Sequence, residues 1–501
     1  MKEVNIEKFT HFFKVSEPEP HVRDVLTDFV KHHLLETRLE YQDGRYVKVP
    51  GRVFAARTKD KREYRFHING LDTFTHFFNG RGYKVNVSKD EREDVYLGDN
   101  VKFMKPEGFQ LRDYQEEANE FLLTDDYTRV IELAMGLGKT KLSLWFLSEY
   151  AKKVCIFVLG RYTERWWGDV GDWVDSDSIL EIRGSLELED VLRNSETPTV
   201  RNTKMFVMTI TTFSDYCTKW ENGSFEDRQA MVPPERVWEV LGVGVRVTDE
   251  THQHFHQNFL TDLYTHLPKA VYLSATLNPG EGFLKKMYEL FLPLKDRFGG
   301  GMQEKYTTVK AMFYRFKEPR KIRCQNRKRM YNHTEFEKWL MKNPKILENY
   351  FLMIDEIVQD EFLSIRKEGQ KMLIFFGTKK MCELYAKRLK QKFKDIDSRR
   401  YISEDKYENL LQADIACSTL GSSGTAVDIP NLRRCLMTTA LKSEQANLQA
   451  LGRLRKLNDD TEFSYLVCTD IPKHLEYHEK KKRLFRDWVK EHRNYFTEKS
   501  L

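Results

Sequence analysis

The chain has 501 residues, 40% of them hydrophobic and 13% aromatic, which is enough apolar material to fill several cores and argues against disorder. Its mean hydropathy is -0.61, and no apolar run approaches the roughly twenty residues that a membrane-spanning helix needs. The net charge of +6 permits phosphate binding without requiring it. The seven cysteines are odd in number and form no C-x-x-C pair, which fits neither a disulfide framework nor a zinc site. We expect a soluble, cytoplasmic protein of about three domains.

The first 100 residues predict a small α+β domain. Apolar positions at helical spacing predict helices over 22–30 and 71–78, the second of which stops at Gly80. Segments 62–68 and 83–87 alternate like half-buried strands. The region should fold by itself, with a charged linker over 89–108. Its basic residues look exposed, and segment 62–68 is expected to present them on one strand face; they are Arg45, Lys48, Arg52, Arg57, Lys59, Lys61, Arg62 and Arg65.

From residue 110 onward, short apolar runs recur between helical or polar stretches. They lie at 129–133, 155–159, 205–208, 243–247 and 270–273, and a second series lies at 372–376, 413–417, 434–437 and 464–467. This pattern is typical of strands that are buried on both faces of a parallel sheet. We therefore predict an α/β chain with two parallel-sheet lobes in tandem. The first spans 101–300. An inter-lobe segment that begins the second lobe spans 301–369, and the rest of that lobe spans 370–501 and ends in a helix.

A phosphate-binding loop is predicted at 133–140, between a strand and a helical run. Glycines let the backbone turn its N–H groups toward phosphate oxygens, and the helix N-terminus adds a partial positive charge. Lys139 can reach the β and γ phosphates, and the Thr140 hydroxyl can bind Mg²⁺. Leu133 stands where the strict motif has glycine. The nucleotide-binding residues expected here are Gly136, Leu137, Gly138, Lys139 and Thr140.

An acidic box follows the strand at 243–247. Asp249 can hold the Mg²⁺ shell, and Glu250 can orient and deprotonate an attacking water. His252 is expected to point toward the neighbouring strand at 270–273. Ser274 and Thr276 follow that strand, and their hydroxyls can bond to the box and sense its state. A solvated acidic turn is the plain alternative. The order of the motifs, with the box 110 residues after Lys139 in the same predicted sheet, favours the catalytic interpretation.

The second lobe carries a basic segment at 449–455. An arginine supplied by a facing lobe can stabilise charge on a transferring γ-phosphoryl group. Arg453 is our candidate for this role and Gln449 for coupling. Arg455 or Lys456 is expected to supply a second contact with the nucleotide.

In this order the motifs resemble those of superfamily 2 helicases over residues 110–470. The matching segments are 112–115 for adenine recognition, 136–140 for motif I, 249–252 for motif II of the D-E-x-H type, 274–276 for motif III, 428–431 for motif V and 449–455 for motif VI. The resemblance implies an ATP hydrolase with two RecA-like lobes that uses ATP and Mg²⁺. It adds Arg112, Gln115 and Asp428 to the nucleotide site. Motif VI departs from the family pattern, since Lys456 stands where the second arginine is usual.

Within that superfamily, the layout is similar to the UvsW-type phage recombination helicases, which also have a small N-terminal domain. This similarity implies a motor on forked or junction DNA in replication, recombination or repair, in the host-cell cytoplasm if the chain is phage-encoded. We expect a monomer. The alternatives are a double-strand translocase that remodels bound protein, an RNA helicase, and a non-catalytic nucleic-acid scaffold.

A motor of this kind mostly contacts the sugar–phosphate backbone. Segment 315–329 is rich in lysine and arginine, with Tyr314, Phe316 and Tyr331 interleaved, which suits phosphate pairing and base stacking. A solvated segment between lobes is the alternative. The candidate nucleic-acid contacts are Arg161, Thr209, Thr212, Arg320, Lys321 and Arg323.

Overall fold

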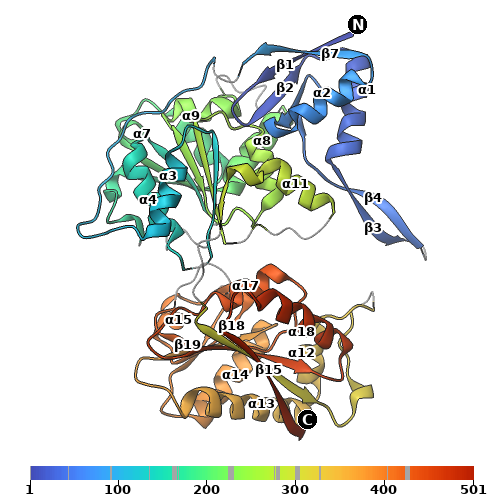
Figure 1. Ribbon diagram of the computed structural model, residues 1–501, viewed down its shortest axis with the longest axis vertical. Coiled ribbons are helices and arrows are strands. Elements are labelled where there is room, and N and C mark those ends of the chain that lie inside the picture. Colours follow the sequence, from blue (N-terminus) through green and yellow to red (C-terminus); the bar gives the residue numbers. More distant parts are fainter. Residues whose placement is uncertain are drawn as a thin grey trace. The chain divides into compact units, whose positions relative to one another are not determined.

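The computed structural model divides into two compact units, residues 1–301 and 302–501, which are described separately (Figure 1). The structure describes residues 2–42, 45–90, 93–134, 136–158, 160, 166, 169–223, 231–275, 277, 282–299, 305–326, 329–402, 404–423 and 429–501. No helix among them is long and apolar enough to cross a membrane. The division into four segments predicted from the sequence stays a prediction.

The first unit begins with a five-stranded sheet in the order β5-β6-β2-β1-β7. Its strands are β1 (Lys2–Lys8), β2 (Phe12–Ser16), β5 (Ala56–Arg57), β6 (Glu63–His67) and β7 (Tyr83–Lys89). Helices α1 (Pro20–Phe29) and α2 (Leu71–Asn79) pack on it through Phe29, Phe74 and Phe78. Strands β3 (Leu35–Gln42) and β4 (Arg45–Val53) leave this body as a separate two-stranded ribbon.

The main sheet of the first unit has seven strands, all paired in parallel, in the order β10-β11-β9-β12-β13-β8-β14. They are β8 (Thr128–Glu132), β9 (Val154–Val158), β10 (Ile179–Ile182), β11 (Met205–Thr209), β12 (Val245–Thr248), β13 (Lys269–Ser274) and β14 (Arg297–Gly299). Ile156 and Val158 belong to the core on one face, whereas Cys155 and Phe157 belong to the core on the other. The sheet is thus buried on both sides, which explains its continuous apolar strands.

Helices cover both faces of this sheet. They are α3 (Asp113–Leu123), α4 (Lys139–Tyr150), α6 (Ser185–Arg193), α7 (Pro198–Asn202), α8 (Ile210–Glu221), α9 (Val237–Val240), α10 (Phe255–Asp262) and α11 (Phe283–Phe291). The strands that precede the phosphate loop, the segment at 274 and the acidic box are β8, β13 and β12, which are direct neighbours. Because the carboxyl ends of parallel strands share one edge, the sheet brings these three loops together.

The second unit holds another parallel seven-stranded sheet, in the order β17-β18-β16-β19-β20-β15-β21. Its strands are β15 (Thr307–Arg315), β16 (Lys371–Phe376), β17 (Ser398–Tyr401), β18 (Ile415–Thr419), β19 (Leu432–Met437), β20 (Thr461–Cys468) and β21 (Glu491–Ser500). Its helices are α12 (His333–Lys342), α13 (Pro344–Val358), α14 (Lys379–Lys392), α15 (Glu408–Gln412), α16 (Leu420–Ser423), α17 (Glu444–Leu451) and α18 (Pro472–Phe485). The predicted fold class, two parallel-sheet lobes in tandem after a small α+β domain, is confirmed. The prediction that the chain ends in a helix is wrong, because β21 follows α18.

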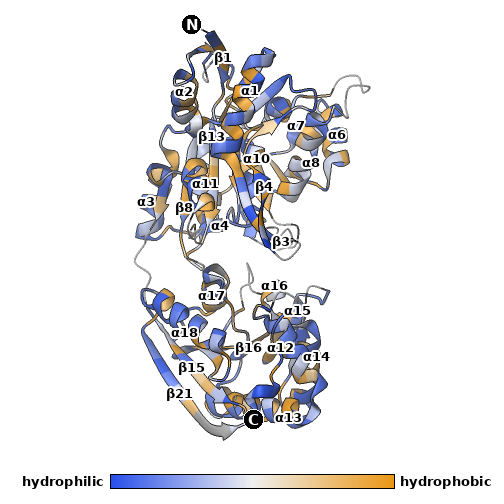
Figure 2. Cartoon of the chain, turned by 90° about the vertical axis from the view of Figure 1, so that its right-hand side faces the viewer, coloured by the Kyte–Doolittle hydropathy of each residue, from blue (hydrophilic) through white to orange (hydrophobic). Residues whose placement is uncertain are grey.

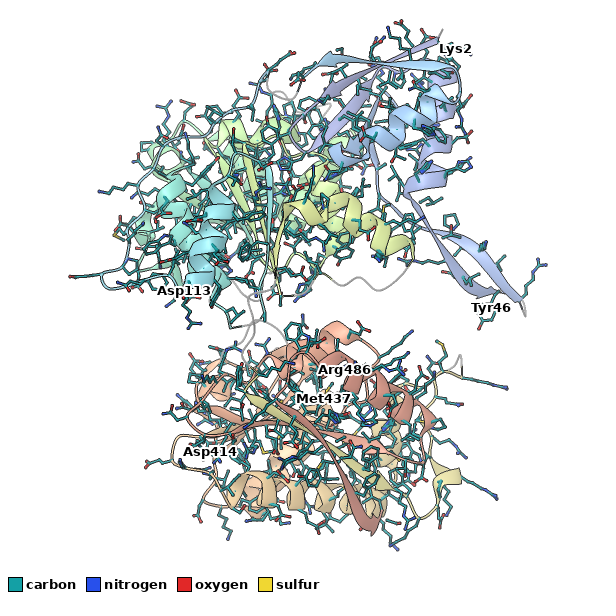
Figure 3. All side chains as sticks on the ribbon, viewed as in Figure 1. Lys2, Tyr46, Asp113, Asp414, Met437 and Arg486 are labelled. Atoms are coloured by element: carbon teal, nitrogen blue, oxygen red, sulfur yellow. The ribbon has the colours of Figure 1, made fainter. Side chains whose placement is uncertain are left out.

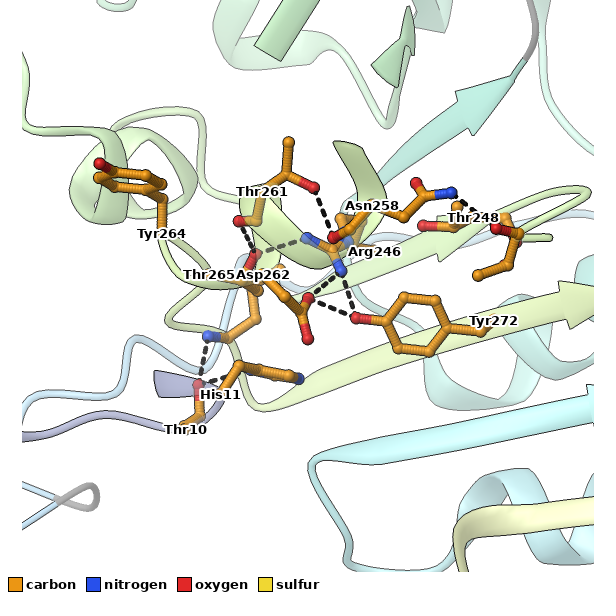
Figure 4. A network of polar contacts seen from close by, with 12 residues as sticks. Thr10, His11, Arg246, Thr248, Asn258, Thr261, Asp262, Tyr264, Thr265 and Tyr272 are labelled. Atoms are coloured by element: carbon orange, nitrogen blue, oxygen red, sulfur yellow. Dashed lines mark hydrogen bonds and ion pairs between the residues drawn. The ribbon is translucent and has the colours of Figure 1, made fainter. Parts of the chain in front are cut away.

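The N-terminal sheet shares a continuous apolar core with one face of the first lobe. A buried polar network joins the two parts (Figure 4). In it Arg246 pairs with Asp262, whose other oxygen lies 3.3 Å from His67 Nε2. Thr10 accepts a hydrogen bond from the backbone N–H of Leu267 at 2.9 Å. This packing therefore does not support the prediction that residues 1–100 fold by themselves.

Arg65 corrects the predicted basic strand face. Its side chain is only 1% exposed, because β6 is an inner strand and the first lobe covers it. It donates to Glu63 Oε1 at 2.6 Å and to Glu235 Oε2 at 3.0 Å, and its guanidinium lies over the ring of Tyr264. Burial alone would raise the pKa of Glu235, but the charge and hydrogen bonds of Arg65 hold that pKa below its ordinary value.

We expect Arg65→Ala to lower the free energy of unfolding by about 3–5 kcal/mol, because Glu235 would stay buried without its partner. Arg62→Ala is the matched control, since the Arg62 side chain is 67% exposed and its loss should change stability by less than about 0.5 kcal/mol. Urea denaturation of the full chain measures both variants. Equal stability of the two variants would contradict this role for Arg65.

Candidate functional site

The loop between β8 and α4 needs its glycines. Gly136 and Gly138 have φ of 84° and 73°, in the left-handed region that favours glycine. A Cβ on Gly138 would also come within 2.7 Å of Gln115 Nε2. The backbone N–H groups at the start of α4 follow this turn directly, which is the arrangement that binds phosphate at a helix N-terminus.

Segment 112–115 is fastened to this loop. Gln115 Nε2 donates to the carbonyl of Leu137 at 3.2 Å, and Tyr114 donates to the same oxygen at 3.1 Å. The backbone N–H of Arg112 in turn donates to Gln115 Oε1 at 3.0 Å, which fixes the amide orientation. The structure thus brings two of the predicted nucleotide residues, Arg112 and Gln115, to the predicted phosphate loop.

Lys139 is buried at the first position of α4. Its ammonium donates to the carbonyl oxygens of Leu133 at 2.9 Å and Ala134 at 3.5 Å, inside the loop. An ammonium group forms stronger hydrogen bonds with an anion than with neutral carbonyl oxygens, because both partners are then charged. The lysine can therefore exchange these carbonyls for phosphate oxygens.

Asp249 lies at the end of β12 with both carboxylate oxygens engaged. Oδ1 accepts the backbone N–H of Glu250 at 2.9 Å, and Oδ2 accepts the indole N–H of Trp166 at 3.0 Å. Burial raises the pKa of Asp249, and the charge of Glu250 adds to this effect. The Trp166 hydrogen bond and the charge of Lys139 act in the opposite direction. Trp166 thus helps to keep a buried carboxylate ionised and oriented.

Glu250, His252 and Ser274 form a chain across two neighbouring strands. Glu250 has a φ of 49°, a strained conformation for a residue other than glycine, and its Oε2 lies 3.3 Å from His252 Nε2. His252 Nδ1 lies 2.8 Å from Ser274 Oγ. Burial lowers the pKa of His252 to about 4, and the charge of Lys139 adds to this effect. The imidazole is therefore neutral near pH 7. Since a carboxylate only accepts, we infer that Nε2 carries the proton and that Ser274 donates to Nδ1.

These residues fit a magnesium nucleotide. No group of three or more His, Cys, Asp or Glu side chains gathers for a metal within the described ranges. A magnesium ion held by one carboxylate, one hydroxyl and the phosphates of its nucleotide needs no such group. Asp249 and Thr140 are of the required chemical types. Glu250 Oε2 is buried, and beyond its 3.3 Å contact with His252 Nε2 it has no hydrogen-bond partner among the described residues, as expected of a group that waits for a water or a ligand.

Trp166 was not anticipated from the sequence, and its hydrogen bond gives a prediction. Trp166→Phe should weaken magnesium-dependent nucleotide binding by about 10-fold, because a hydrogen bond to a charged acceptor is lost. Binding in the presence of EDTA should change little. Trp173→Phe is the matched control, since Trp173 lies in the same core and packs edge-on against Phe109. Titration of a fluorescent ATP analogue measures both variants. A loss that is the same with and without magnesium would show that Trp166 only supports the core.

The second unit holds the remaining candidates around α17. Gln449 lies in this helix, and Arg453 follows it with a side chain 1% exposed. Arg455 is half-buried and donates to the carbonyl of Leu454 at 3.3 Å, whereas Lys456 is exposed. Their roles stay predictions. Arg161, Thr276 and Asp428 lie outside the described residues.

The candidate nucleic-acid residues differ in accessibility. Thr209 caps α8 by accepting the N–H of Thr212 at 3.2 Å. Thr212 itself is buried, and its hydroxyl accepts the N–H of Gly184 at 3.1 Å. Arg320, Lys321 and Arg323 are exposed near the end of β15. A backbone contact at these residues stays a prediction.

The predicted stacking surface beside these basic residues is wrong. Tyr314 and Phe316 are buried in the core of the second unit. Tyr331 packs beside them, and its hydroxyl lies 2.7 Å from His333 Nδ1 and 2.6 Å from His474 Nε2. The aromatic side chains therefore stabilise the fold, whereas the described basic side chains of this segment are exposed, at Arg315, Lys317, Arg320, Lys321, Arg323 and Arg329.

Comparisons with known proteins support the architecture. No protein-family model matches the sequence, and no curated protein gives a significant match. Among solved structures, a point variant of S. cerevisiae Dbp5 bound to RNA and ADP BeF3 is 13% identical, with a TM-score of 0.50, and the match covers 78% of this chain and 90% of that chain. The chain has the fold of two tandem RecA-like lobes. The crystal structure of T4 UvsW is 11% identical, covers 99% of this chain and 100% of that chain, and has a TM-score of 0.32.

Proposed function

We propose that this chain is an ATP-driven nucleic-acid motor, a superfamily 2 helicase or translocase that acts on forked or junction DNA. The observation that carries the proposal is a cluster of polar groups at one edge of the first unit's main sheet. A glycine phosphate loop with Lys139, a buried carboxylate at Asp249, and the series Glu250–His252–Ser274 lie on three neighbouring strands. This set of groups suits hydrolysis of a nucleoside triphosphate.

In the proposed reaction Lys139 leaves the carbonyls of Leu133 and Ala134 and binds the phosphates. Thr140 and Asp249 would hold Mg²⁺, which neutralises phosphate charge when bound. Glu250 takes a proton from a water as the water oxygen attacks the γ-phosphorus and the bond to the ADP oxygen breaks. The products are ADP and inorganic phosphate, and the proton leaves through Glu250.

His252 and Ser274 are proposed to couple the reaction to movement. A change in the position or charge of Glu250 alters its contact with His252, and the imidazole transmits it to Ser274 at the end of the neighbouring strand. From the second lobe, Arg453 is proposed to stabilise charge on the transferring phosphoryl group, while Asp428 and either Arg455 or Lys456 contact the nucleotide.

An RNA helicase is the second candidate, because the similar Dbp5 structure has RNA and ADP BeF3 bound. The deciding experiment measures ATP hydrolysis with single-stranded, duplex, forked and four-way DNA and with RNA. We expect the largest stimulation with branched DNA and none in Lys139→Ala. Stimulation by RNA alone would favour the second candidate. The absence of stimulation by any nucleic acid would overturn the motor proposal.

A further inference from the structure

The β3–β4 ribbon projects from the body of the first unit and pairs with no other described strand (Figures 1 and 2). Tyr46 lies near its far end (Figure 3). The side chains of Tyr46 and Leu39 are 72% and 65% exposed. Two-stranded ribbons are marginally stable in water, and a large aromatic side chain that stays mostly exposed on one buries little apolar surface. The exposed face therefore needs another explanation.

The two faces of the ribbon differ in charge. Directly paired residues project from the same face, so the register places Lys48 beside Leu39 and Pro50 beside Thr37, on the face that also carries Tyr46. Among the described residues from Thr37 to Pro50, this face has one ammonium group and no carboxylate. Glu40 lies on the opposite face with Arg38 and Arg45. An aromatic ring, an aliphatic side chain and a single cation are suited to a base and its phosphate. Pro50 removes a backbone donor from β4, which disfavours addition of a protein strand.

A local network of hydrogen bonds holds the root of the ribbon. Glu36 accepts hydrogen bonds from Arg52 at 2.7 Å and from Arg38 at 3.0 Å. The Arg52 hydrogen bond is the main reason that the pKa of Glu36 falls to about 2. The N–H of Phe54 donates to the carbonyl of Leu34 at 2.8 Å. The direction in which the ribbon projects is therefore set by its anchor.

That anchor lies on the helices that follow the acidic box and the segment at 274. Phe54 is fully buried and contacts Phe255, His256 and Phe259 of α10, as well as Phe283 of α11. His256 Nε2 also lies 2.6 Å from the carbonyl oxygen of Val53. Only two residues separate His252 from Phe255 along the chain. A short, packed path thus connects the acidic box with the root of the ribbon.

We propose that the β3–β4 ribbon is a wedge for the branch point of a nucleic acid, where duplex strands part. Tyr46 stacks on the terminal base, Leu39 covers its edge, and Lys48 contacts the adjacent phosphate. The inference rests on the proposed motor function and names the part of the chain that meets the branch. Movement of the acidic box during ATP hydrolysis would shift the wedge against the junction.

The test compares the affinities of the full chain for a labelled forked DNA and for single-stranded DNA by fluorescence anisotropy. Tyr46→Ala should weaken fork binding by about 10-fold, as expected for the loss of one stacked base, and should affect single-stranded DNA little. Tyr46→Phe keeps the ring and should bind forks like the wild type. Leu186→Ala removes another exposed leucine, on α6, and controls for general surface effects. Since Tyr46 is exposed, folding and basal ATP hydrolysis should be unchanged.

Two results would overturn the wedge. One is unchanged fork affinity in Tyr46→Ala while the wild type binds forks, and the other is an equal loss for fork and single strand. A wild type that binds no nucleic acid at all would overturn the motor proposal together with the wedge. Failure of the wedge alone and failure of the motor are therefore distinguishable.

Discussion

Glu250→Gln should leave ATP binding intact and reduce turnover on the order of 10²-fold or more. The amide has the shape of the carboxylate, so the contact of position 250 with His252 and the fold of the box should persist. An amide cannot accept the proton of the attacking water. Apart from the 3.3 Å contact with His252 Nε2, which an amide oxygen can keep, the buried Oε2 has no hydrogen-bond partner among the described residues that the loss of charge would affect.

Equilibrium binding of a fluorescent ATP analogue and single-turnover hydrolysis separate these two effects. Glu239→Gln is the control, because Glu239 is a partly exposed glutamate that pairs with Arg236 on the surface. Lys139→Ala should instead weaken nucleotide binding itself, since its ammonium is the cation inside the phosphate loop. Hydrolysis near the wild-type rate in Glu250→Gln would mean that another group accepts the proton.

The inner strands of both lobes could be predicted because they are buried on two faces. Val154–Val158 and Lys371–Phe376 contain continuous apolar runs, which are typical of strands in the middle of a parallel sheet. The edge strands β10, β14, β17 and β21 were missed, since an edge strand is short or carries charge. Strand β15 was missed because its apolar and polar residues alternate and a basic segment follows it.

The candidate site divides in the same way. The phosphate loop and the acidic box are local motifs, in which residue type and spacing already carry the chemistry. The contact of Trp166 with Asp249 joins residues 83 apart in the chain, and only the fold of β9 and β12 side by side brings them together. Arg65 was expected on an exposed face because its strand alternates. Its partner Glu235 lies 170 residues away in the chain, so no local sequence pattern can predict the pairing.

Arg453 differs from its prediction in the opposite direction. The sequence predicts that its side chain extends to a phosphoryl group on the facing lobe, whereas the structure places it in the interior of the second unit. A buried arginine has two possible uses. It can hold the turn after α17 in place, or it can wait for a nucleotide that enters later. Its charge lies close enough to Cys435 in β19 to lower the pKa of that thiol, which burial otherwise raises. Structural and catalytic loss must therefore be separated by experiment.

Arg453→Ala should reduce nucleic-acid-stimulated ATP hydrolysis roughly 10³-fold, while ATP affinity stays nearly intact, if the guanidinium stabilises the transferring phosphoryl group. Arg453→Lys keeps a charge of similar reach but loses the planar donor fork, so it should recover folding without recovering the rate. Thermal unfolding of both variants reports the structural contribution, and single-turnover hydrolysis reports the catalytic one. Arg455→Ala and Lys456→Ala should be milder and should differ from each other, because one side chain is half-buried and the other exposed. A fully active Arg453→Ala beside an inactive Arg455→Ala would move the catalytic role to Arg455 and leave Arg453 as a support of the turn.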